Sequence, residues 1–419
     1  MDLSLQILLT IAMLILAAKL AGALAGRVGL PVVLGELLAG ALLGPSALNI
    51  WSLRWFAASP AAGSMSAEAV FKILAQLGVV LLMFVAGLET NADLLRKAVA
   101  PAFWAALGGV ALPLAGASLV ARGAGLSWPE AIFLGTVLTA TSVAISAQSL
   151  MNLQQMGSKP GAILLAAAVI DDILGLIVLS LVIAIVPHGG QSVALPWRSL
   201  GITLARMGLC LATIFWLGPP LTRWVIQRSQ RLRGLHTELA AALFVAFLLA
   251  FHAQWTGGMA AITGSYLAGL FVAGTPAHGR VTREVYPMIH SFFGPLFFVS
   301  VGLSVDVWQL RGHFGFFALL LLVAILGKVI GCGLGARFNG ITARESIVVG
   351  VGMIPRGEVG LIAASIGLAA GLLARETYAQ VVVVVLAADL VTPGLLRFAF
   401  PKDTLARAVA SSGGMDHIA

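Results

Sequence analysis

Charged residues are scarce in this sequence. Asp, Glu, Lys and Arg together make up 10% of its 419 residues, whereas a soluble globular domain carries about 25%. Hydrophobic residues reach 59%, and the mean hydropathy is +1.01. This composition excludes an ordinary soluble domain and predicts an all-α polytopic membrane protein.

Cysteine is also scarce. The two cysteines, Cys210 and Cys332, lie in apolar segments, so we expect small buried side chains rather than a disulfide or a metal site. Residues 1–25 lack the basic region of a secretory signal and are long enough to span a bilayer, which predicts a first membrane span. The net charge of +8 is expected to set topology through the loops rather than to bind nucleic acid.

Thirteen stretches of the sequence are apolar enough to be membrane helices, since about 20 apolar residues span the hydrocarbon core. The second is short, and Gly44-Pro45 at its end is a helix stop signal. The predicted spans are 3–25, 31–45, 69–89, 98–121, 129–150, 160–187, 197–219, 236–254, 258–275, 285–305, 313–336, 344–371 and 376–398. They form one predicted transmembrane domain, residues 1–398.

Basic residues between the spans predict the orientation of the chain. With the N-terminus outside, the inner loops and the C-terminal tail hold fifteen Lys and Arg residues, and the outer loops hold six. Because Lys and Arg are enriched in cytoplasmic loops, we expect the N-terminus outside and the C-terminus in the cytoplasm. Residues 399–419 are expected to form a short cytoplasmic tail without an attached soluble domain.

The two halves of the sequence resemble each other. GELLAG at 35–40 matches GSYLAG at 264–269, and MFVAGLETNADLL at 83–95 matches FFVSVGLSVDVWQL at 297–310. Matching segments lie seven spans apart, an odd number, so the second copy would enter the membrane from the opposite side. This predicts an inverted-topology repeat, typical of secondary transporters; chance similarity between Gly- and Leu-rich helices is the alternative. The expected repeats are about 31–219 and about 258–398.

Two predicted spans, again seven apart, contain residues that disrupt helices. The span 129–150 has a run of hydroxyl residues near its middle, and Pro and Gly interrupt the span 344–371 beside two charges. These residues are Thr139, Thr141 and Ser142 in the first span, and Pro355, Arg356, Gly357 and Glu358 in the second. Because broken helices free backbone groups inside the membrane, such breaks at matching positions predict a transport site where they cross.

Asp171 and Asp172 are adjacent in the span 160–187. A charge at the bilayer centre costs about 2.5–3.5 kcal/mol on insertion scales, so two neighbouring carboxylates indicate a function. Successive helical residues point about 100° apart, so one carboxylate can face the crossing while the other meets another helix. Lys328 in the span 313–336 is the predicted partner; snorkelling of Lys328 to the interface is the alternative.

Three further charges are predicted to support the site. Arg356 and Glu358 are expected to stabilise the broken span rather than to bind an ion, and a purely structural ion pair between them is the alternative. Asp389 lies 217 residues after Asp172. For Asp389 we favour a satisfied polar group in helix packing over an ion ligand.

The motifs resemble those of a known family. VIDDILGLIVLS, TATSVAISA, ILGKVIGCGLGA and GVGMIPRGEVGLI are similar to segments of the bacterial monovalent cation/proton antiporter-2 family, and most similar to the NapA-type sodium/proton antiporters. The resemblance covers about residues 25 to 398. It implies an NhaA/NapA-like fold with two crossing broken helices, a homodimer, and a core that moves like an elevator against a dimerisation scaffold.

The resemblance also implies the parts of the site. Asp172 would carry the cation and the proton, Asp171 would pair with Lys328, and Thr141, Ser142 and nearby backbone would complete the monovalent-cation (metal) site. The expected partners are membrane lipid, protons and sodium or lithium, with no cofactor, no nucleic acid and no enzymatic activity. The expected location is the bacterial cytoplasmic (inner) membrane, where a proton gradient would drive cation export.

Several alternatives stay open from the sequence. Competition between a proton and a cation for one carboxylate site gives antiport when access alternates. Sodium is the expected cation, and potassium is the main alternative. A cation channel would pass ions without proton coupling. An intramembrane aspartyl protease would need its two carboxylates on facing helices. If cation binding breaks the Asp171–Lys328 pair and Lys328 loses a proton, two protons exchange per cation and antiport is electrogenic.

Overall fold

The computed structural model describes residues 3–28, 30–53, 66–185, 197–232, 236–306, 308 and 314–400. These residues form helices joined by turns, and no strand occurs among them. Nine of their helices are long and apolar enough to cross a membrane, and three shorter ones are also apolar. The predicted all-α class is therefore confirmed, and the lengths of these helices fit membrane spans. Residues 401–419 of the predicted tail lie outside the described residues.

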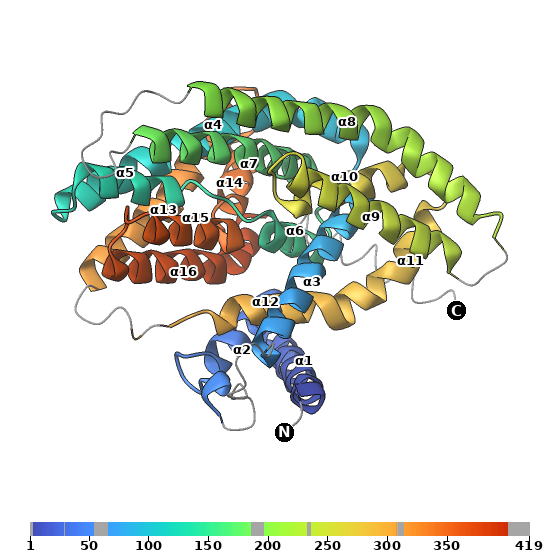
Figure 1. The fold of residues 1–419 in the computed structure, drawn as a ribbon, viewed down its shortest axis with the longest axis horizontal. Coiled ribbons are helices and arrows are strands. Elements are labelled where there is room, and N and C mark those ends of the chain that lie inside the picture. The colour runs from blue at the N-terminus through green and yellow to red at the C-terminus, as the bar shows by residue number, and fades with distance from the viewer. Residues whose placement is uncertain are drawn as a thin grey trace. The chain divides into compact units, whose positions relative to one another are not determined.

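The chain divides into two compact units, each built from two separate stretches of sequence. The first unit comprises Met1–Glu89 and Gly201–Gln309. Its helices (Figure 1) are α1 (Leu3–Arg27), α2 (Val32–Leu43), η1 (Ile50–Ser52), α3 (Ala67–Glu89), α8 (Trp197–Ser229), α9 (Thr237–Trp255), α10 (Ala261–Ala273), α11 (His278–Met288), η2 (Ile289–Phe293) and α12 (Gly294–Leu303). As predicted, α2 ends directly before Gly44-Pro45.

The second unit comprises Thr90–Leu200 and Leu310–Ala419. Its helices are α4 (Ala92–Gly123), α5 (Trp128–Val137), α6 (Val143–Asn152), α7 (Lys159–Ile185), α13 (Phe314–Arg337), α14 (Ala343–Gly352), α15 (Gly357–Ala369) and α16 (Arg375–Ala399). All residues singled out for the candidate site belong to this unit. The spans predicted at 129–150 and 344–371 are each two helices separated by a short break, which confirms both predicted interruptions.

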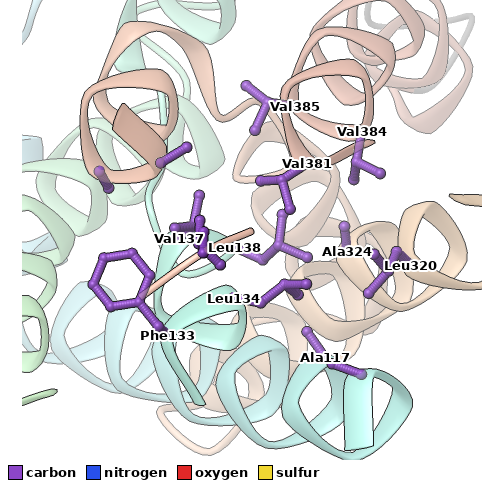
Figure 2. Packing of buried hydrophobic residues seen from close by; sticks show 14 of the residues in the cluster. Ala117, Phe133, Leu134, Val137, Leu138, Leu320, Ala324, Val381, Val384 and Val385 are labelled. Carbon is purple, nitrogen blue, oxygen red and sulfur yellow. The ribbon is translucent and has the colours of Figure 1, made fainter. Parts of the chain in front are cut away.

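An apolar core joins α4, α5, α13 and α16 within the second unit (Figure 2). Val381, Val384 and Val385 of α16 are spaced by three and four residues, which places them on one face of the helix. They are buried in the same cluster as Leu134 of α5 and Ala324 of α13. This packing fixes α5, α13 and α16 against one another, and these helices and the breaks beside them carry the polar groups described below.

Some helix boundaries differ from the prediction because hydropathy alone misses polar helix ends. Helix α4 begins at Ala92, before the predicted 98, because the Asn91 side chain caps it by accepting hydrogen bonds from Asp93 N and Leu94 N, at 2.9 and 3.2 Å. Helix α8 continues to Ser229, ten residues past the predicted end, through a segment that contains Arg223 and Arg228 and was therefore too polar to be predicted as a membrane span.

Helices α4 and α13 approach closely at a pair of glycines. A Cβ atom on Gly108 would meet the carbonyl oxygen of Gly331, and a Cβ atom on Gly331 would meet that of Gly108. Small residues allow such backbone contact between membrane helices, where dispersion and polar contacts replace the hydrophobic driving force. The glycine pair therefore sets how closely α13 lies against α4.

We predict that Gly331→Ala destabilises the protein by about 1–3 kcal/mol, because the added methyl group overpacks the helix crossing. Thermal unfolding in detergent would measure the loss. Gly315→Ala on the same helix is the matched control, since a Cβ atom there would meet open space. Equal unfolding temperatures for the two variants would contradict the close approach.

Candidate functional site

A buried ion pair links α7 to α13. Lys328 Nζ donates to Asp171 Oδ1 at 3.0 Å, and the two side chains are 0% and 1% exposed. Charges in so apolar a setting are tolerated when they are paired, and removing one partner leaves an uncompensated buried charge. The predicted pairing of Asp171 with Lys328 is therefore present in the structure. Asp172, the next residue on α7, is 8% exposed.

The break between α5 and α6 runs from Leu138 to Ser142. Threonine hydroxyls also bond to backbone acceptors around its start: Thr136 Oγ1 donates to Ile132 O at 2.9 Å, and Thr139 Oγ1 donates to Thr136 O at 2.8 Å. Such local bonds compete with a regular helix. The hydroxyls of Thr141 and Ser142 are buried and have no hydrogen-bond partner within the part of the chain that the structure describes.

The break between α14 and α15 contains Pro355, which has no backbone N–H, and it is followed by Gly357, the first residue of α15, whose φ of +51° is left-handed. It meets the α5–α6 break directly, because Ser142 N donates to Pro355 O at 2.8 Å. Ser146 Oγ also donates to Gly352 O. The two interrupted helices thus exchange polar contacts at their breaks.

Arg356 joins the two breaks to α13. Its side chain is fully buried, with Nη1 donating to Ala140 O at 3.0 Å and Nη2 donating to Ala324 O at 2.7 Å. A helix C-terminus exposes carbonyl groups with partial negative charge. The guanidinium therefore satisfies the carbonyl group of Ala140, which lies in the α5–α6 break, and adds a hydrogen bond to the carbonyl group of Ala324 inside the continuous helix α13.

Asp389 of α16 contacts the other side of the α14–α15 break. Arg356 N donates to Asp389 Oδ1 at 2.7 Å, and Gly357 N lies 3.1 and 3.2 Å from Oδ1 and Oδ2. Asp389 is 0% exposed. These bonds agree with the prediction of a satisfied polar group in helix packing.

The structure brings most of the predicted site residues into one network. The pair Asp171–Lys328 and the two contacting breaks follow the sequence prediction. The partners of Arg356 were missed, because its acceptors, Ala140 O and Ala324 O, are backbone groups that no side-chain motif identifies. Glu358 lies in the first turn of α15, and its side chain falls outside what the structure describes.

Charges buried between interrupted, membrane-length helices define a polytopic membrane protein with an internal ionic centre, an arrangement typical of secondary transporters. The sequence pattern of the family described as "Sodium/hydrogen exchanger, transmembrane" matches residues 13–402, and the chain belongs to this family. The resemblance found in the motifs is thereby confirmed at the level of the family.

Two relatives illustrate the similarity. The Na(+)/H(+)-K(+) antiporter GerN of Bacillus cereus is 35% identical over 403 residues, covering 95% of this chain and 97% of the relative. The high-affinity Na(+)/H(+) antiporter NhaS3 of Synechocystis sp. is 34% identical over 422 residues, covering 94% and 90%. The structure of the sodium proton antiporter MjNhaP1 from Methanocaldococcus jannaschii shares the fold, with a TM-score of 0.65 at 14% identity, covering 97% of this chain and 99% of that one.

We predict that Gly357→Ala disturbs the contact between the two breaks. Its φ is left-handed, and an added Cβ atom would meet the Ser142 side chain. Gly371→Ala is the matched control, since Gly371 has a similar φ of +68° but open space around it. Because only the first variant adds a steric clash, it should cost about 1–3 kcal/mol more in thermal unfolding. Equal losses would mean that Ser142 does not pack against Gly357.

Proposed function

We propose that this protein is a secondary active antiporter that exchanges sodium or lithium for protons across a membrane. The observation that carries the proposal is the pair of adjacent buried carboxylates on α7, of which Asp171 is held by Lys328 at 3.0 Å. The family assignment and the names of the relatives GerN and NhaS3 support it. Charged residues inside a membrane are costly and rare, and those that occur typically mark an ion or proton pathway.

Asp172 is the proposed carrier of both the cation and the proton. A carboxylate can bind either a proton or a monovalent cation but not both at full occupancy, so each site is loaded with one or the other. Alternating access of the loaded site to the two sides gives exchange. The proton gradient then drives cation export.

Thr141 and Ser142 are the proposed additional ligands. Their hydroxyl oxygens are buried without a partner among the described residues, and helix α7 packs against α5, α6 and α14. Oxygen ligands suit a hard cation. Asp171 is the second carboxylate, Lys328 is its ion-pair partner, and Arg356 and Glu358 are supporting charges of the break.

The finer architecture is also part of the proposal. The helices fit thirteen spans if α5–α6, α11–α12 and α14–α15 each count as one, and the two breaks fit an inverted repeat over about 31–219 and 258–398 with an NhaA/NapA-like fold. Each unit draws one segment from each half of the chain, which agrees with such a repeat. The second unit contains the whole ionic centre, which suits an elevator-type movement.

The setting of the protein is proposed on the same basis. We place it in the bacterial cytoplasmic (inner) membrane as a homodimer, with residues 1–398 as the transmembrane domain, the N-terminus outside and the tail 399–419 in the cytoplasm. Its partners are monovalent cations, protons and lipid.

Potassium is the second candidate cation, because the relative GerN is named as a Na(+)/H(+)-K(+) antiporter. An aspartyl protease is disfavoured, since Asp171 and Asp172 are neighbours on one helix and Asp171 binds Lys328. A channel would conduct cations without moving protons, and the transport assay below separates this case.

We predict that Asp172→Asn abolishes exchange, because the amide can neither release a proton nor balance the charge of a cation. The assay uses purified protein in liposomes with an internal pH dye and added sodium, lithium or potassium. Asp93→Asn is the control, since Asp93 is an exposed carboxylate in the first turn of α4.

The outcomes of this assay separate the alternatives. Dissipation of the proton gradient by potassium alone would change the substrate and keep the class of transporter. No response of the wild-type protein to any cation over a range of pH would refute antiport. Wild-type rates in Asp172→Asn would refute the role of Asp172.

We predict that Lys328→Gln changes the voltage dependence of transport. If cation binding breaks the Asp171–Lys328 pair and releases a proton from Lys328, two protons exchange per cation and net charge moves. Without the lysine that proton is absent, so the transport current in voltage-clamped vesicles should fall or vanish. An unchanged current per cation would refute the role of Lys328. Because Lys328→Gln alone leaves Asp171 unpaired, at a cost of about 3–5 kcal/mol, Asp171→Asn with Lys328→Gln is the control for stability.

A further inference from the structure

Helix α15 is capped by a residue from another helix. Its N-cap residue, Arg356, provides no side-chain cap. The first free N–H groups, those of Arg356 and Gly357, instead donate to the carboxylate of Asp389 on α16, at 2.7 to 3.2 Å. Asp389 is fully buried, so water does not compete for these hydrogen bonds.

The chemistry of the break favours a carboxylate at this position. The N-terminus of a helix carries partial positive charge and unpaired N–H donors, and an anion stabilises both. Two carboxylate oxygens can also serve two neighbouring N–H groups at once. An amide would keep one acceptor and lose the negative charge.

A short series of contacts leads from Asp389 to the proposed cation ligands. Asp389 holds the backbone of Arg356 and Gly357. From this segment, Pro355 O accepts from Ser142 N at 2.8 Å, and Arg356 Nη1 donates to Ala140 O at 3.0 Å. Residues 140 and 142 flank Thr141 in the chain, so both neighbours of Thr141 are fixed by the segment that Asp389 holds.

We propose that Asp389 is a positioning residue for cation binding: it holds the α14–α15 break so that the α5–α6 break presents Thr141 and Ser142 to the cation. This inference rests on the proposed antiport function. Asp389 does not itself bind the ion, because its carboxylate is committed to the N-terminus of α15. It acts through the position of the 355–357 segment.

The test compares Asp389→Asn with the wild-type protein in pH-dye liposomes over a series of sodium concentrations. Mutation of residues that orient the ligands of a metal site typically lowers the affinity for the metal by about 10-fold to 100-fold. We therefore expect the sodium KM to rise at least about 10-fold, with a smaller change in maximal rate. Stabilisation of the purified protein by sodium in thermal unfolding should need a correspondingly higher concentration.

Thr392→Val is the matched control. Thr392 is also 0% exposed on α16, one turn after Asp389, and its hydroxyl donates to Ala388 O of its own helix at 2.7 Å. It therefore tests loss of a buried polar group without touching the break. Its sodium KM should stay at the wild-type value even where its unfolding temperature falls.

The outcomes separate positioning from a purely structural role. A wild-type sodium KM in folded Asp389→Asn overturns the inference, even if stability is lost. If Asp389→Asn does not fold, Asp389→Glu takes its place, since it keeps the charge and displaces the acceptors; a wild-type KM there also overturns the inference. Absence of sodium-dependent proton movement in the wild-type protein would instead mean that the proposed function is wrong.

Discussion

The second unit depends on one constraint: a charge or an open helix end inside an apolar medium must meet a partner in the protein. Lys328 and Asp171 meet this constraint by pairing with each other at 3.0 Å. The guanidinium of Arg356 donates hydrogen bonds to backbone carbonyl groups, and the carboxylate of Asp389 accepts hydrogen bonds from backbone N–H groups. Because an unsatisfied backbone group costs several kcal/mol in hydrocarbon, the contacts of Arg356 with Ala140 O and of Asp389 with Arg356 N and Gly357 N stabilise the two helix breaks.

The breaks are therefore best understood together. Helix α5 ends and α6 begins where α14 ends and α15 begins, and a backbone hydrogen bond from Ser142 to Pro355 joins the two interruptions. Backbone groups that bond to each other across this contact are satisfied without water as a hydrogen-bond partner. The hydroxyls of Thr141 and Ser142 are buried at this break and have no hydrogen-bond partner among the described residues, which is why we propose them as cation ligands.

Much of this arrangement could be predicted from the sequence, because its signals are local. Apolar length marked the helices, Pro355 and the hydroxyl run marked the breaks, and the rarity of membrane charges singled out Asp171, Asp172 and Lys328. The partners of Arg356 could not be predicted, since its acceptors are carbonyl groups of residues 216 and 32 positions away in the chain. The polar start of α4 was missed for another reason: its capping residue, Asn91, precedes the apolar segment.

The distance along the chain between Asp171 and Lys328 has a consequence for how the protein is made. The two residues are 157 positions apart, and ribosomes add about 5–20 residues per second. Asp171 is therefore synthesised about 8 to 30 seconds before its partner exists. During insertion, that carboxylate must be accommodated by water, by the insertion machinery or by earlier helices. Final assembly of the ionic centre has to wait for the second half of the chain.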